Sequence, residues 1–118
     1  MRKQELIRYR NTLAEQLAAL GRHVAHTAQE LADSGEDLPD PTDRATRETD
    51  LEGEIRMRDR DRRMAAMIQS ALARIDAGTF GTCVSCGLSI PEERLRARPE
   101  TDLCIECKRE AERIQSRV

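Results

Sequence analysis

Aromatic side chains are nearly absent from this sequence: its 118 residues include one Phe, one Tyr and no Trp. Because aromatic rings supply much of the area that globular cores bury, this scarcity excludes a broad globular core. The sequence also has no apolar run long enough to cross a membrane and no signal-peptide pattern, since its first 35 residues are charged throughout. We therefore expect a cytoplasmic protein.

An excess of charge of one sign is also missing from most of the chain. The formal net charge is −2, and residues 80–118 carry seven basic and seven acidic side chains. Only residues 36–50 are clearly unbalanced, with two basic and six acidic side chains. Proteins that bind nucleic acid by neutralising phosphates need a basic face, which no part of this chain provides. Direct sequence-specific DNA binding is therefore not expected.

The residues that are abundant are typical of long helices. The chain is 36% charged and 38% hydrophobic, and it is rich in Ala, Leu, Arg and Glu. In its first 31 residues, apolar positions recur at steps of three and four, which predicts a helix of about seven turns with one buried face. His23 and His26 flank this face and should be exposed. The face consists of Leu6, Tyr9, Leu13, Leu17, Leu20, Val24, Thr27 and Leu31.

A break in this pattern separates the first helix from a second one. One Gly and two Pro interrupt it within residues 34–41, and Asp40 before Pro41 is typical of an N-cap followed by proline at the first helical position. The second helix should run from Pro41 to Ala77 and end at Gly78. Its expected buried positions are Leu51, Ile55, Met57, Met64, Ile68, Leu72 and Ile75.

Two helices with matched apolar faces and a short turn predict an all-α fold built on an antiparallel coiled-coil hairpin. The hairpin should occupy residues 1–78 and be about 45 Å long, at about 1.5 Å per residue. Residues 36–50 would form its acidic tip, and residues 79–118 a separate module that ends in a helix over residues 108–118. Residues 56–63 are too polar to form a plain apolar seam.

The four cysteines of the chain form its most specific motif. Cys83, Cys86, Cys104 and Cys107 stand in the pattern C-x2-C-x17-C-x2-C. Each C-x2-C pair makes a tight turn that directs two sulfurs to one position, and four thiolates complete a tetrahedron around Zn2+ at about 2.3 Å. Gly87 suits the left-handed residue of such a turn. One zinc ion held in this way has no open coordination position, so it would be structural rather than catalytic.

Other uses of these motifs fit less well. Disulfides are rare in a reducing cytoplasm, and a thioredoxin-type site would need a βαβ pattern. DNA-binding fingers of the GATA type share the cysteine spacing but need a basic helix, whereas the segment after Cys104 contains three glutamates. Asp40 and Asp43 would suit a catalytic metal ion, but nothing else in the sequence supports catalysis, so we expect no enzyme.

These motifs together resemble the DksA/TraR family of C4-type zinc-finger transcription regulators, and within it the DksA-like members. The resemblance covers nearly the whole chain. The stretches that carry it are residues 40–45 (DPTDRA, where the family has D-x-x-D-x-A), 58–62 (RDRDR), 80–83 (FGTC), 86–87 (CG), 94–99 (RLRARP) and 102–108 (DLCIECK).

The resemblance implies a regulator that binds RNA polymerase, inserts its hairpin through the secondary channel and changes the stability of promoter open complexes, often together with ppGpp. It implies that Asp40, Asp43 and Ala45 are functional tip residues and that Arg60 contacts the partner. From the residues alone, helix capping remains an alternative for the two aspartates, and a solvated helix face remains one for Arg60.

For ppGpp, the resemblance implies that Arg98 and Lys108 supply cations of the family's binding pocket, whereas Met67 stands where the family has a lysine. We expect a monomer that lacks the N-terminal extension of longer DksA proteins, because the hairpin begins almost at Met1. The alternative function is a zinc-finger nucleic-acid-binding or adaptor protein.

Overall fold

The computed structural model describes residues 1–33 and 40–117, and within these residues the fold is all-α, as predicted. The only β-type pairing in this part of the chain is an isolated antiparallel bridge between Thr82 and Ser89. The helices are α1 (Lys3–Asp33), α2 (Pro41–Ala77), α3 (Glu92–Ala97) and α4 (Ile105–Ser116).

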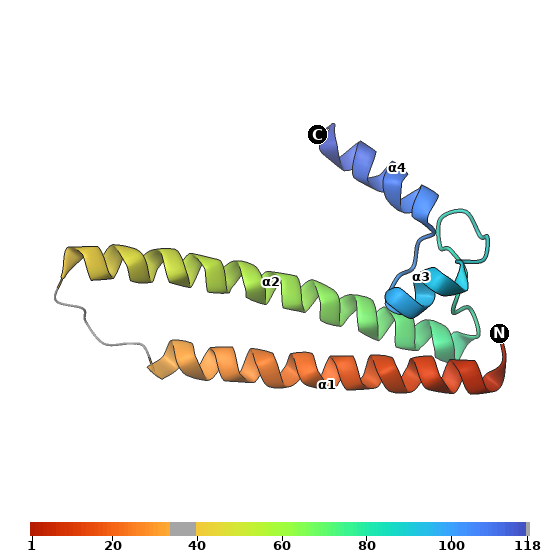
Figure 1. Ribbon diagram of the computed structural model, residues 1–118, viewed down its shortest axis with the longest axis horizontal. Helices are drawn as coiled ribbons and strands as arrows, with labels where there is room; N and C mark the ends of the chain where they lie inside the picture. The colour runs from red at the N-terminus through yellow and green to blue at the C-terminus, as the bar shows by residue number, and fades with distance from the viewer. Residues whose placement is uncertain (34–39, 118) are drawn as a thin grey trace.

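The molecule is a rod because α1 and α2 run antiparallel along most of its length (Figure 1). Its principal extents are 60 × 36 × 20 Å, and its radius of gyration is 18.9 Å. A compact domain of this length would have a radius of gyration of about 13–14 Å. The N-terminus, α3 and the cysteine-containing loops gather at one end of the rod, which we call the base, and the C-terminal end of α1 and the N-terminal end of α2 lie toward the other (Figure 1).

Both ends of α2 are set by the residues expected from the sequence. The side chain of Asp40 accepts a hydrogen bond of 2.9 Å from the backbone N–H of Thr42, with Pro41 at the first helical position. At the other end, Gly78 has φ 77°, and its N–H is directed to the last carbonyls of the helix. These capping predictions are therefore confirmed, whereas residues 36–39 of the expected acidic tip lie outside the described part of the chain.

The predicted buried face of α1 is also confirmed for every position whose side chain is described. Leu13 is fully buried, and its neighbours on the face are partly buried against α2 and the base. Thr27 and Leu31 lie outside the described side chains. The confirmed positions are Leu6, Tyr9, Leu13, Leu17, Leu20 and Val24.

The seam of α2 differs from the prediction in its half toward the tip. Ile55 and Met57 were expected to be buried but are 55% and 54% exposed. One row of buried and half-buried positions instead recurs at alternating steps of four and three, which is the spacing of a helix packed along one partner, and Gly53, Met64, Ala71 and Arg74 are buried or half-buried beside this row. This spacing places polar side chains in the seam. The positions are Arg47, Leu51, Glu54, Arg58, Asp61, Ala65, Ile68, Leu72 and Ile75.

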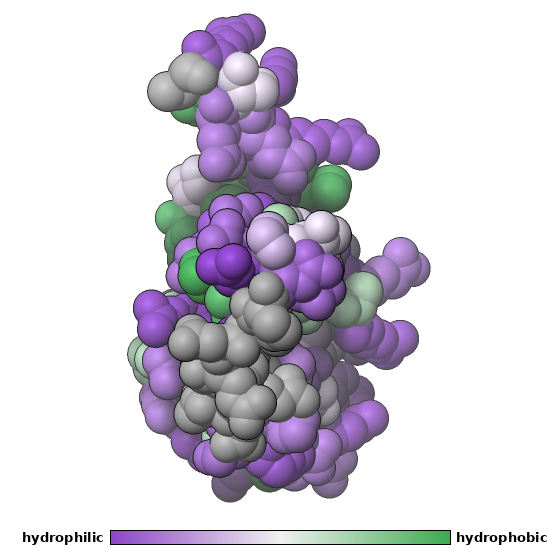
Figure 2. Space-filling model, turned by 90° about the vertical axis from the view of Figure 1, so that its left-hand side faces the viewer, coloured by the Kyte–Doolittle hydropathy of each residue, from purple (hydrophilic) through white to green (hydrophobic). Residues whose placement is uncertain are grey.

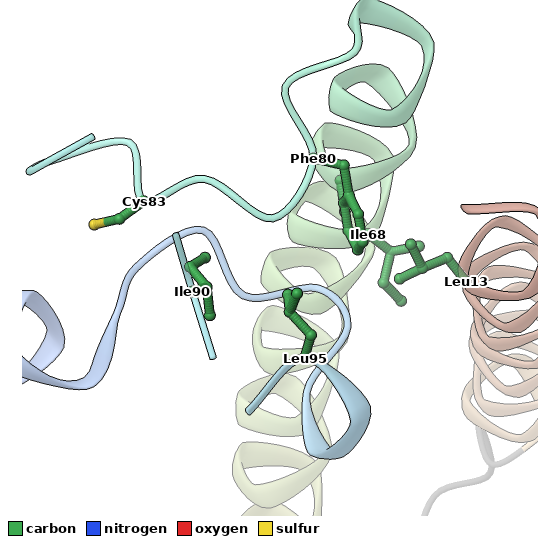
Figure 3. Close-up of a cluster of buried hydrophobic side chains, with 7 residues drawn as sticks. Leu13, Ile68, Phe80, Cys83, Ile90 and Leu95 are labelled. Carbon is green, nitrogen blue, oxygen red and sulfur yellow. The ribbon is translucent and has the colours of Figure 1, made fainter. Parts of the chain in front are cut away.

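The apolar core lies at the base and joins the hairpin to the finger. Leu13 from α1 and Ile68 from α2 converge with Phe80, and Ile90 and Leu95 continue the cluster toward the cysteines (Figure 3). All five side chains are at most 7% exposed. The residues after α2 are therefore folded onto the hairpin rather than tethered to it.

The last helix is different, because α4 contains no buried residue. It begins at Ile105, three residues before the expected start, and projects away from the hairpin (Figure 1). No helix in the described ranges is long and apolar enough to cross a membrane.

Candidate metal centre and hairpin tip

The first cysteine pair lies in a tight turn held by backbone hydrogen bonds. The N–H of Cys83 donates to Leu88 O at 2.8 Å, and the N–H of Gly87 donates back to Cys83 O at 3.0 Å. Gly87 has φ 76°, a conformation that side chains with a Cβ rarely adopt. The expected left-handed glycine is therefore present, and the turn directs Cys83 and Cys86 toward the same side.

The second pair lies where the chain enters α4. Cys104 is the N-cap residue of α4 and has an extended backbone, and Cys107 follows in the first helical turn. The N–H of Lys108 donates to Cys104 O at 2.9 Å. The start of the helix thus sets the spacing between the two sulfurs of this pair.

The two turns bring all four sulfurs together. The four Sγ atoms lie within 4.8 Å of one another, and Cys86 Sγ is 3.8 Å from Cys104 Sγ. The edge of a tetrahedron with zinc–sulfur bonds of about 2.3 Å is about 3.8 Å, so the cluster has the size of a zinc site. All four cysteines are free thiols, which contradicts a pair of disulfides. The donor set fits one structural zinc ion, as the sequence predicted.

The surroundings of Cys83 and Cys107 shift the pKa values of their thiols in opposite directions. Backbone N–H groups of Cys86 and Cys104 point at Cys83 and lower the pKa of its thiol to about 6. Hydrogen bonding with Cys104, together with burial, raises the pKa of Cys107 to about 12. Cys83 therefore presents a thiolate more readily than Cys107, and binding of zinc must displace the proton of Cys107.

At the other end of the rod, the expected tip residues lie in the first turns of α2. Asp40, Asp43 and Ala45 are all exposed. Asp40 is the N-cap, and Asp43 lies in the first helical turn, where the positive end of the helix favours a carboxylate. The surface seen from this end is mainly hydrophilic (Figure 2). Capping accounts for the place of Asp40 and the positive end of the helix for that of Asp43, and both side chains remain exposed.

Arg60 lies midway along α2 and is exposed. It borders an open surface depression of about 660 Å3 that is also lined by Gly53, Arg56 and Met57. Asp50 and Glu54 line it too, so the depression combines two guanidinium groups with two carboxylates and an exposed thioether. The sequence pointed to Arg60 through the family resemblance but had placed Met57 in the seam.

The three positions connected with ppGpp lie on three different elements. Arg98 follows the last residue of α3 and is exposed, whereas Lys108 lies in α4 and is half-buried. Met67 lies on α2 and is 39% exposed.

Sequence reasoning missed two arginines that contact the segment before Cys104. Arg74 of α2 and Arg94 of α3 both donate to backbone carbonyls of residues 101–103. Arg94 lies in the family-like stretch 94–99, but the sequence assigned it no role, and Arg74 lies in none of the quoted stretches. An arginine that binds a backbone carbonyl has the same spacing on its helix as a solvated one, so spacing alone identifies neither contact.

Two family models match the chain in succession. Residues 5–75 match the N-terminal domain of DnaK suppressor protein DksA, and residues 78–113 match the prokaryotic dksA/traR C4-type zinc finger.

Individual relatives extend this similarity over nearly the whole chain. The RNA polymerase-binding transcription factor DksA of Haemophilus influenzae is 36% identical over 118 residues, which cover 100% of this chain and 81% of the relative. The protein of the same name from Escherichia coli K12 is 38% identical over 112 residues, which cover 95% and 74%. The structure of transcription factor DksA2 from Pseudomonas aeruginosa superimposes with a TM-score of 0.84 at 28% identity and covers 98% of this chain and 89% of that one.

A helical hairpin with four converging thiols at its base defines a C4 zinc-finger protein with a projecting coiled coil. The chain belongs to the DksA/TraR family.

Proposed function

We propose that this chain is a transcription regulator that binds RNA polymerase and does not bind DNA directly. One observation carries the proposal: relatives named RNA polymerase-binding transcription factor DksA match it over both the hairpin and the finger. The balanced charge of residues 80–118 supports a protein partner, because α4 carries Glu106, Glu110 and Glu112, which would repel phosphates.

The shape of the molecule suggests how it acts. A rod 60 Å long that presents the exposed carboxylates of Asp40 and Asp43 toward its end remote from the base is suited to enter a channel, and we propose that it enters the secondary channel of the polymerase. In this arrangement Asp40, Asp43 and Ala45 would act near the catalytic centre and change the stability of open complexes. Arg60 and its surroundings on α2 would contact the channel wall.

The two parts of the chain then have separate tasks. Residues 1–78 would form the inserted hairpin, and residues 79–118 would form the module that stays outside and sets its orientation. We further propose that the protein acts as a monomer in the cytoplasm, supplies no catalytic group and uses ppGpp as a second ligand through Arg98 and Lys108.

A binding competition tests the proposal. Labelled full-length protein is titrated with RNA polymerase core enzyme, and a transcript-cleavage factor that occupies the secondary channel is then added. We expect saturable binding that the cleavage factor displaces. Binding to free DNA with a steep dependence on salt, and none to the polymerase, would instead favour the nucleic-acid-binding alternative.

A further inference from the structure

The segment that leads into the second cysteine pair is held from three directions. Thr101 O accepts from Arg74 Nη2 of α2 at 3.5 Å, and Asp102 O accepts from the N–H of Val84 at 2.9 Å. Leu103 O accepts from Arg94 Nε of α3 at 2.9 Å. Three successive carbonyls are thus fixed by the hairpin, the first cysteine turn and α3. The chain therefore reaches Cys104 in one defined path.

Arg94 makes the shortest side-chain contact to this segment and makes two bonds at once. Besides Leu103 O, it reaches Thr101 Oγ1 with Nη2 at 3.4 Å, and Thr101 Oγ1 itself lies 3.2 Å from Leu103 O. Thr101 is only 7% exposed, and Arg94 is half-buried. A planar guanidinium that binds two acceptors fixes a turn more firmly than a single flexible cation does.

We infer that Arg94 is a positioning residue of the zinc centre, which holds Leu103 so that Cys104 and Cys107 meet the first cysteine pair. The geometric reason is sequence adjacency, because the carbonyl that Arg94 binds belongs to the residue directly before Cys104. Without that bond, Leu103 O keeps only the 3.2 Å hydrogen bond from Thr101 Oγ1, so the path into Cys104 is held less firmly. The Cys104 sulfur, which lies 3.8 Å from Cys86 Sγ, is then less well positioned. Residues that orient the ligands of a metal typically contribute a factor of about 10–100 to its affinity.

The inference concerns the metal centre alone, so it does not depend on binding to RNA polymerase. The neighbouring Arg96 offers a matched control, because it lies on the same short helix and is bonded to Glu92 at 2.9 Å on the surface. Loss of Arg96 removes the same charge from α3 and leaves residues 101–103 untouched.

The test uses the full-length zinc-loaded protein and a colorimetric chelator in excess. We expect Arg94→Ala to bind zinc about 10–100 times more weakly than the wild type in competition with the chelator, and therefore to transfer it to the chelator faster. Arg96→Ala should match the wild type, and Arg94→Lys should lie between, because an ammonium group can replace one of the two bonds. Circular dichroism should report an unchanged hairpin in all three variants.

A second readout separates positioning from general stabilisation. When Co2+ replaces zinc, the d–d absorption bands report how the four sulfurs are arranged. These bands should change in Arg94→Ala and remain unchanged in Arg96→Ala. Zinc transfer within twofold of the wild type in Arg94→Ala would overturn the inference. Equal loss of hairpin helicity in Arg94→Ala and Arg94→Lys would overturn it too, since the residue would then support the fold rather than the site.

Discussion

Tyr9 and Phe80, the two aromatic residues of the chain, pack against each other in a tilted arrangement, with ring centroids 5.2 Å apart and an angle of 49° between the ring planes. The contact joins the first turns of α1 to the segment that leads into the finger. Burial raises the pKa of Tyr9, and the nearby carboxylate of Glu92 acts in the same direction. A chain with few large side chains thus uses both of its aromatic rings at the junction of hairpin and finger.

Removal of the buried ring should destabilise this junction. Phe80 is 7% exposed and packs beside Leu13 and Ile68, so Phe80→Ala should lower the free energy of unfolding by about 3–5 kcal/mol. Tyr9→Phe keeps the ring contact and should change stability little. Urea denaturation of the zinc-loaded protein measures both. An effect of Phe80→Ala below about 1 kcal/mol would mean that the core does not depend on this contact.

Loss of one zinc ligand should affect the base more than the rod. Cys104→Ser should release the zinc ion and loosen residues 79–118, while most of the hairpin helix remains. Ordering the backbone of the finger costs about 1–2 kcal/mol per residue. The finger buries too few apolar side chains to offset this cost, so its folding depends on the metal.

Elemental analysis and circular dichroism of Cys104→Ser measure these two effects. Cys83→Ser removes a ligand from the first cysteine pair, and this variant should lose zinc in the same way. Wild-type protein purified under reducing conditions without zinc would contradict the structural role of the metal.

A substitution at the tip should impair regulation without weakening the binding of RNA polymerase. Asp43→Asn removes one charge with almost no change in shape, and Asp40 rather than Asp43 provides the N-cap. We therefore expect near-normal affinity for RNA polymerase and a large loss of the effect on open-complex lifetime. Asp40→Ala, which removes the cap, should cost about 1 kcal/mol of helix stability.

Lifetime measurements at equal occupancy of the polymerase test the role of Asp43. Asp40→Asn is the control for charge, because Asn still caps the helix. If Asp43→Asn regulates as well as the wild type, the carboxylates are helix caps and not functional groups.

A response to ppGpp should depend on Arg98 and Lys108, because a pyrophosphate needs converging cations. Arg98→Ala should weaken the response of the polymerase-bound protein, and Met67→Lys should strengthen it, since the exposed side chain of Met67 can be replaced without disturbing the core. The neighbouring Arg96→Ala serves as the control. Identical ppGpp titrations for the wild type and Arg98→Ala would count against this site.

The polar part of the α2 seam should be replaceable by apolar residues. Glu54 Oε2 and Arg58 Nε are buried atoms without a hydrogen-bond partner. The double variant Glu54→Leu with Arg58→Leu should raise the free energy of unfolding by about 1–4 kcal/mol, whereas Arg58→Leu alone should lower it by leaving a carboxylate unbalanced. Met57→Leu, on the exposed face, should be neutral. The urea midpoints of the three variants measure these changes in stability. A destabilised double variant would show that the polar side chains stabilise the seam more than leucines do.

Local chemistry explains why much of this fold could be predicted. Asp40 caps the start of α2 and Gly78 its end through hydrogen bonds to nearby residues. Each cysteine turn depends on two cysteines that are separated by two residues. The apolar face of α1 is likewise continuous. Each of these features depends on residues that are close in the sequence.

The features that escaped prediction depend on distant contacts. An apolar pattern assigned Ile55 and Met57 to the seam, but the register is set at the base by Ile68 and Leu72 and carries polar residues inward near the tip. His23 and His26 are exposed, as expected, but the contact of His23 Nε2 with Asp61 Oδ2 at 3.5 Å across the hairpin was not predicted. The carbonyl contacts of Arg94 cannot be predicted from composition at all.

The polar seam also affects how one copy of the chain meets another. A seam of leucines alone would suit the helices of a second copy in several registers, so opened hairpins could exchange partners. With Glu54, Arg58 and Asp61 in the seam, a shifted pairing would set these groups against apolar side chains. We therefore expect these polar residues to favour the pairing of each helix with its partner in the same chain over pairing with a second copy.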